Sequence, residues 1–129
     1  MIKMAPKYLY KILDESPPDP LPKTLPTTPL DATDGFIHLS NAQQTAITAK
    51  LFFSNHTVLW VLKLDSSALD GRIEFSTDPK AGVPDGCAHV HDSKVGLGNG
   101  NVVELVKVER KDGEEWTDVE GFKGLRNDA

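Results

Sequence analysis

A cluster of prolines near the N-terminus constrains this chain more than any other sequence feature. Six of its nine prolines lie between Ser16 and Pro29, and each fixes the backbone dihedral φ and removes a hydrogen-bond donor. No regular helix or central strand can run through this segment, so we expect a long surface loop over residues 16–29. Only enough chain for one strand precedes it, and the loop therefore belongs to the same domain as the rest. The 129 residues predict a single domain over 1–129, with an ordered core over about 8–122 because few apolar anchors follow.

Alternating and apolar runs predict several strands and one main helix. We expect the helix from Asn41 to about Phe53, with Ser40 as its N-cap and Gln43 completing a capping box. One helix among strands, without regular alternation of the two, predicts an α+β fold with a mixed, mostly antiparallel sheet. The run Thr57–Leu64 is apolar on both faces, which predicts a central strand. The other expected strands are Tyr8–Leu13, Gly35–Ser40, Arg72–Ser76, Cys87–His91 and Asn101–Arg110.

Charge and composition narrow the partners that this chain can have. There are 14 Lys and Arg against 19 Asp and Glu, a net charge of −5 without a basic cluster, so we expect no duplex nucleic acid partner. No apolar run reaches the roughly 18 residues that a membrane helix needs, and we expect no membrane association. A single cysteine, Cys87, fits a reducing compartment, which predicts a cytoplasmic protein. The oligomeric state is left open.

The segment GFIHLS at Gly35–Ser40 is the first candidate for a functional site. Strand alternation places Phe36, His38 and Ser40 on one face, directly before the expected helix. The free N–H groups and the positive dipole end at a helix N-terminus suit a phosphate or a carboxylate. An anion site is one interpretation. The other is a Ser40 helix cap beside a hydrogen-bonded core histidine.

The segment CAHVH is the second candidate. Cys87, His89 and His91 share one face if this segment is a strand. Thiolate and imidazole are zinc ligands, so a zinc-dependent enzyme is an alternative, although the spacing is weak and we assign no metal ligand. Cys87 as a nucleophile with His89 as its base, or Cys87 as a small buried hydrophobe, are the other interpretations. The glycines from Gly96 to Gly100 precede a strand, which predicts a flexible turn rather than a dinucleotide loop.

Five features together resemble the family called domain of unknown function 952. They are LYKIL at Leu9–Leu13, GFIHLS at Gly35–Ser40, Gln44, the apolar strand at Val58–Leu64, and His89. That family is similar to a compact ADP-ribosyltransferase fold, which implies a split sheet around a cleft that holds NAD in active relatives. The implied cofactor is NAD.

The same resemblance implies roles for individual residues. His38 lies near the position where active transferases hold a tyrosine or histidine beside the nicotinamide, and His89 matches a histidine of the family. His38 and His89 are therefore the candidate catalytic residues, and we predict that they line one cleft. The implied ligand-binding residues are Tyr10, Lys11, Ser40, Gln44 and His91.

Three functions follow as hypotheses. The first is a histidine-lined cleft for an NAD-type or ADP-ribose-type nucleotide, or for another small molecule, with transferase or glycohydrolase chemistry. The second is a binding module without catalysis, because no glutamate of this chain matches the transferases' catalytic glutamate. The third is the zinc-dependent enzyme that uses Cys87, His89 and His91. Lys11 is expected either to bind a diphosphate or to extend from the strand edge into water.

Overall fold

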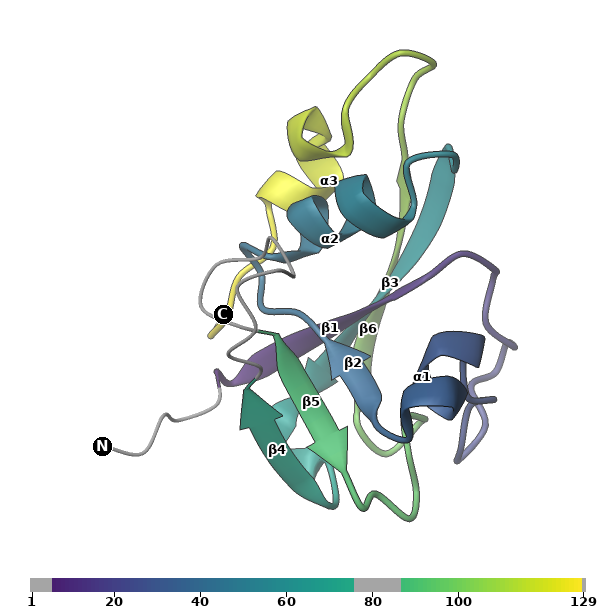
Figure 1. Cartoon of the computed structure of the whole chain (residues 1–129), viewed down its shortest axis with the longest axis vertical. Helices are drawn as coiled ribbons and strands as arrows, with labels where there is room; N and C mark the ends of the chain where they lie inside the picture. The colour runs from purple at the N-terminus through teal and green to yellow at the C-terminus, as the bar shows by residue number, and fades with distance from the viewer. Residues whose placement is uncertain (1–5, 76–86, 129) are drawn as a thin grey trace.

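The computed structural model describes residues 6–75 and 87–128, which form two three-stranded sheets with helices around them (Figure 1). Every pairing between the described strands is antiparallel, so the α+β class and the antiparallel sheets are confirmed. Parallel pairing, which a mixed sheet would require, does not occur among them. One sheet has the order β1-β3-β6, with β1 at Tyr8–Leu13, β3 at Val58–Asp65 and β6 at Val102–Glu109. The other has the order β2-β5-β4, with β2 at Ile37–Leu39, β5 at Ala88–His91 and β4 at Arg72–Phe75.

The sheet β1-β3-β6 has an apolar core on each face. Alternation along β1 sends Tyr10 and Ile12 into one core and Leu9 into the other. The first core lies under the helices α2 (Thr45–Phe52) and α3 (Glu120–Lys123), and the second lies between the two sheets. The prediction that Thr57–Leu64 forms a central strand covered on both faces is therefore confirmed.

The helix α1 (Pro29–Asp34) was not predicted, because it begins at the last residue of the proline segment. Thr28 caps it by accepting a hydrogen bond from the backbone N–H of Asp31, and Pro29 occupies the first helical position, where its missing N–H costs nothing. Gly35 ends the helix with φ at 80°. The described part of the chain also contains the short 3₁₀ helices η1 at Ser66–Ala68 and η3 at Trp116–Asp118. Within the described ranges, no helix combines the length and the apolar character needed to cross a membrane.

The main helix begins later than predicted, and Ser40 is not its cap. The backbone of Ser40 pairs with Tyr10 of β1, which holds Ser40 in an extended conformation and joins the two sheets. A reciprocal pair of the capping-box type instead closes the turn before the helix: the N–H of Gln44 donates to the Asn41 side chain, and the N–H of Asn41 donates to the Gln44 side chain, both at 2.9 Å. The N–H of Ala42 donates to the side chain of Asn127. Three N–H groups at the expected helix start, those of Asn41, Ala42 and Gln44, are thus bonded within the protein.

The C-terminal segment is better anchored than the sequence suggested. Trp116, Val119 and Phe122 recur every three residues and are all buried in the core beneath α2. Beyond them, the carbonyl of Arg126 accepts a hydrogen bond from the hydroxyl of Tyr10, and the carbonyl of Asn127 accepts one from the N–H of Tyr8. The expectation of poor order beyond Phe122 therefore differs from the structure, in which this segment is tied to β1.

The glycine segment packs against the proline loop and is not a flexible turn. The N–H of Asn99 donates to the carbonyl of Pro22, and the buried Asn101 side chain bridges the carbonyl of Gly96 and the N–H of Gly98. A Cβ atom at Gly98 would lie 2.7 Å from the carbonyl oxygen of Pro22 and closer still to the carbonyl group of Lys23. Only glycine fits at this contact between two backbones.

We expect Gly98→Ala to lower the free energy of unfolding by about 2 kcal/mol, because one of two backbone segments must move. Urea unfolding of the purified variant measures this. Gly100→Ala is the matched control, since a Cβ atom there meets nothing within 4 Å, and its stability should stay within about 0.5 kcal/mol of the parent. Equal losses in the two variants would contradict the close approach at Gly98.

Candidate functional site

His38 and His89 are direct cross-strand neighbours in the sheet β2-β5-β4. Their ring centroids lie 5.1 Å apart in an edge-to-face arrangement, and Phe36 contacts both rings. The opposite face of these strands carries Leu39 and Val90, which fill the core between the sheets. Core packing on one face therefore fixes the two imidazoles on the other, because strand side chains alternate.

Both histidines line one pocket, with a volume of about 320 Å³, so the structure brings the two candidate catalytic residues together. Ser40 and Thr48 add polar groups to the lining, and their hydroxyl groups are joined at 3.2 Å. Its walls are apolar and come from β1, α1, β2 and the end of α2. The wall residues are Ile12, Leu30, Leu39, Phe52 and Phe53, and the remaining lining residues are Tyr10, Lys11, Asp34 and Cys87.

The ring of His38 is held between two carboxylates of α1. Its Nδ1 lies 2.6 Å from Oδ1 of Asp31, which also accepts the backbone N–H of His38 at 3.1 Å. Its Nε2 lies 2.9 Å from Oδ2 of Asp34. To donate to both carboxylates at once, the ring must carry a hydrogen on each nitrogen, as only the imidazolium form does.

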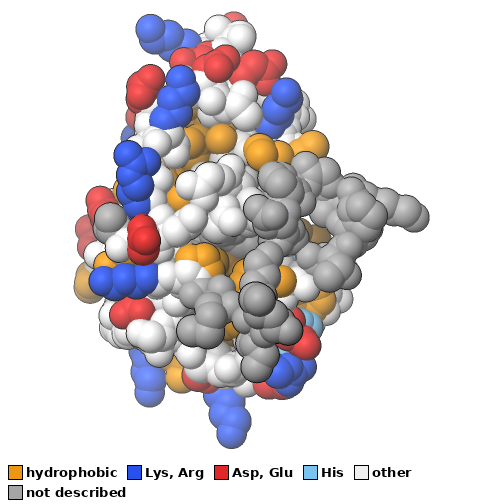
Figure 2. Space-filling view, turned by 90° about the vertical axis from the view of Figure 1, so that its left-hand side faces the viewer, with side chains coloured by type: hydrophobic (Ala, Val, Ile, Leu, Met, Phe, Trp, Pro, Cys, Tyr) orange, Lys and Arg blue, Asp and Glu red, His pale blue; other side chains and the backbone are white. Residues whose placement is uncertain are grey.

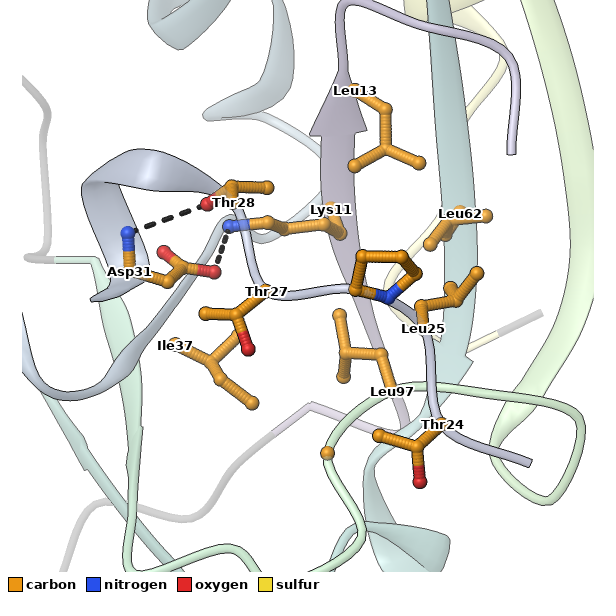
Figure 3. A pocket seen from close by; sticks show the side chains of 12 residues that line it. Lys11, Leu13, Thr24, Leu25, Thr27, Thr28, Asp31, Ile37, Leu62 and Leu97 are labelled. Carbon is orange, nitrogen blue, oxygen red and sulfur yellow. Dashed lines mark hydrogen bonds and ion pairs between the residues drawn. The ribbon is translucent and has the colours of Figure 1, made fainter. Parts of the chain in front are cut away.

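Lys11 lies beneath His38 and is buried, with 7% of its surface exposed. Figure 3 shows its side chain running from β1 towards Asp31, beside a pocket of about 60 Å³ under the proline loop. Its ammonium donates to Oδ2 of Asp31 at 2.7 Å and to the carbonyl of His38 at 3.0 Å. The expectation that Lys11 extends into water is therefore wrong. The ammonium has two protein partners, which leaves it one donor at most for a diphosphate.

Burial and neighbouring charges shift the pKa values of Asp31 and Lys11 in opposite directions. Burial alone raises the pKa of Asp31, but hydrogen bonds from His38 and the charge of Lys11 outweigh it and hold the pKa below its usual value. Burial lowers the pKa of Lys11, although Asp31 opposes the change. Asp31 thus stays ionised as the common partner of Lys11 and His38.

His89 differs from His38 in its partners, because no carboxylate contacts its ring among the described residues. Burial lowers its pKa below the ordinary histidine value, and the neighbouring rings of His38 and His91 lower it further, so His89 is neutral near pH 7. Within the described ranges its ring makes ring contacts but no hydrogen bond. A neutral imidazole carries one donor and one acceptor, and His89 can offer both to a ligand.

The other predicted residues divide into two groups. Tyr10, Lys11 and Ser40 line the histidine pocket, whereas Gln44 is buried in the turn before α2 and His91 pairs with Glu74 at 3.2 Å outside it.

The cysteine alternatives are not supported. Cys87 lines the pocket, but burial raises the pKa of its thiol, which opposes a reactive thiolate. Among the residues that the structure describes, Cys87, His89 and His91 included, no group of three or more such side chains is arranged to hold a metal ion.

Sequence reasoning missed the two carboxylates that contact His38, Asp31 and Asp34, because it missed α1. A readable signal was present. Thr28-Pro29 followed by Asp31 is a helix start, and Asp34 precedes His38 by four residues. The apolar rim was also missed, since Leu30 and Phe52 are 53% and 61% exposed and lie outside both cores.

The surface in Figure 2 shows basic and acidic side chains interspersed, and no contiguous basic patch appears on that face.

The fold and the site together define a small α+β protein with two antiparallel sheets and a pocket lined by paired histidines. The same fold occurs in Protein CC0527 from Caulobacter crescentus, solved by X-ray crystallography, with a TM-score of 0.60 and 20% identity, covering 81% of this chain and 88% of that chain. A double mutant of CC0527 matches at 19% identity with the same TM-score and coverage.

Residues 21–105 match the family described as "Protein of unknown function (DUF952)", and the chain belongs to that family. The match includes both histidines but begins after β1, so the segment Leu9–Leu13 of the sequence resemblance lies outside it. No curated protein matches the chain. At 20% identity, the likeness to CC0527 concerns the fold alone.

Proposed function

We propose that the histidine pocket binds a small molecule, with His89 presented to the ligand and His38 held behind it. The observation that carries this proposal is the cross-strand pairing of His38 with His89 on the floor of a pocket of about 320 Å³. Pockets with apolar walls and a few convergent polar groups are the usual sites of small ligands. The exposed side chains of Leu30 and Phe52 support the same function, because exposed apolar groups gathered at one pocket mark binding sites.

Nucleotides of the NAD or ADP-ribose type are the first ligands to test, because the resemblance to the ADP-ribosyltransferase fold implies them. Binding without turnover is the form of this function that the site supports best. Both nitrogens of His38 face carboxylates, the pKa of the Cys87 thiol is raised, and the ammonium of Lys11 is bound to Asp31. These groups are engaged or unreactive, and catalysis needs groups that act more strongly on the transition state than on the bound substrate.

The test is a thermal-shift screen with NAD, ADP-ribose and nicotinamide. A ligand at 100 times its dissociation constant stabilises the native state by about 2.7 kcal/mol, which is readily measured. We expect His89→Leu to abolish the shift that a binding probe gives, because the neutral imidazole is lost from the pocket floor. His56→Leu is the matched control, since His56 lies beside Asp14 outside the pocket.

Two results would contradict this function. If His89→Leu and His56→Leu respond like the parent to a binding probe, the ligand does not use the histidine pocket. Nicotinamide release from NAD at about 1 per second or more, abolished by His89→Leu, would show that the pocket catalyses and does not merely bind.

A further inference from the structure

The charges beneath the pocket are unevenly paired. Asp31 is buried and serves two cations, because its two oxygens contact Lys11 and His38 separately. One positive charge of this group is left over. Asp34 balances it by accepting from Nε2 of His38 at 2.9 Å.

The contact between Asp34 and His38 is the weakest one in the group. The side chain of Asp34 is 38% exposed, whereas that of Asp31 is 4% exposed. Exposed ion pairs contribute about 0 to 1 kcal/mol, since water and salt screen them. Asp34 is also the last residue of α1, where the negative end of the helix dipole disfavours a carboxylate. The Asp34 carboxylate can therefore be displaced at small cost.

The space beside this contact suits an apolar group. Leu30 and Phe52 form the rim and Ile12 and Phe53 the deeper wall of the same pocket that Asp34 and His38 line. A ligand carboxylate that replaced Asp34 at His38 Nε2 would place its body against these side chains. The neutral ring of His89, 5.1 Å from that of His38, could then donate to the second carboxylate oxygen.

We infer that the pocket takes a compact organic monocarboxylate with an apolar body, and that Asp34 occupies the place of the ligand's carboxylate in the protein alone. This inference rests on the proposed function and names its ligand class. A single negative charge matches the single unpaired cation, because Lys11 is already committed to Asp31. A second negative charge, as on a diphosphate, would remain unpaired near apolar walls, which is unfavourable.

The experiment compares carboxylates with their neutral amides. Benzoate and benzamide, and hexanoate and hexanamide, are titrated into the parent protein and into Asp34→Asn, with binding followed by amide chemical shifts. We expect Asp34→Asn to bind the two carboxylates about fivefold more tightly, the upper end of an exposed ion pair at about 1 kcal/mol, and the two amides unchanged. Asp34→Ala removes the residual hydrogen bond that asparagine can make to His38, and should show at least the same gain.

Asp14→Asn is the matched control, because Asp14 stands beside His56 at 3.6 Å but outside the pocket. It should leave all four affinities unchanged. Tighter binding of the carboxylates by Asp14→Asn as well would overturn the inference, since a general change in net charge would then explain the gain.

The remaining outcomes separate this inference from the proposed function. Weaker carboxylate binding by Asp34→Asn, or equal gains for amides and carboxylates, would overturn the ligand class while leaving the pocket as a binding site. If none of the four probes binds either protein, the monocarboxylate class is also rejected. The nucleotide screen with His89→Leu then decides the proposed function independently.

Discussion

Replacing Lys11 by methionine should lower the free energy of unfolding by about 3 kcal/mol, one of the two largest effects that we expect in this protein. The substitution keeps a long apolar side chain but leaves the buried Asp31 with one cationic partner fewer. Breaking a buried ion pair on one side typically costs about 3 to 5 kcal/mol, because the remaining charge is uncompensated. We expect the lower end of that range, since His38 still donates to Asp31 from its ring and its backbone.

Lys107→Met is the matched control for this substitution. Lys107 also lies on a strand and pairs with Glu109 at 3.2 Å, but both side chains are more than half exposed. Its loss should cost about 1 kcal/mol or less. The double variant Lys11→Met with Asp31→Asn should recover part of the loss, because the uncompensated charge is gone. A loss that the double variant does not reduce would show that packing, not charge, makes Lys11 important.

Acid unfolding gives an independent measure of how the ionised Asp31 beside Lys11 contributes to stability. The pKa of Asp31 is lower in the folded protein than in the unfolded chain, so its contribution to stability is complete above about pH 4 and is lost as the pH falls through the folded-state value. Asp31→Asn removes this component. The parent should therefore lose stability more steeply below about pH 4 than Asp31→Asn does, and parallel curves would contradict an ionised Asp31.

Much of the strand layout was predictable, because alternation is a local signal. Within one strand, the order of apolar and polar residues is enough to place Leu9 and Tyr10 on opposite faces, and His38 opposite Leu39. The choice of partner strand is different. Nothing within Gly35–Ser40 specifies that His38 pairs directly with His89, because that register depends on core packing between distant segments.

The errors in predicting the start of α2 and the presence of α1 have local causes. Two overlapping capping boxes, Ser40 with Gln43 and Asn41 with Gln44, are equally good as sequence signals. The structure forms the second pair, in the turn before α2, because the backbone of Ser40 is already paired with Tyr10. The helix α1 was missed because the proline cluster that excludes a helix before Pro29 also supplies its first residue.

The C-terminal segment gives the other large effect: Trp116→Ala should lower the free energy of unfolding by about 3 to 5 kcal/mol. Trp116 is 2% exposed and packs edge-to-face on Phe122, with ring centroids 5.7 Å apart. Its Nε1 donates to the carbonyl of Phe53 at 3.0 Å, just after α2. Removing the ring leaves a cavity and takes away one of the two hydrogen bonds that the Phe53 carbonyl accepts, since the N–H of His56 still donates to it.

Trp116→Phe separates these two costs. Phenylalanine keeps a ring against Phe122 but loses the hydrogen bond to Phe53, so we expect a smaller loss than for alanine, about 1 to 2 kcal/mol. Urea unfolding measures both variants. Equal losses for alanine and phenylalanine would show that the hydrogen bond, not the packing of the ring, anchors the segment.

The same contact connects the C-terminal segment to the proposed site. Phe53, whose carbonyl accepts from Trp116, also forms part of the apolar wall of the histidine pocket, next to Phe52. If Trp116 holds this end of α2 in place, Trp116→Phe should weaken binding of a pocket ligand while the protein remains folded, because the wall is less firmly positioned. Titration of the folded variant with a probe that binds the parent tests this. Unchanged affinity would mean that the core beneath α2 positions Phe53 without Trp116.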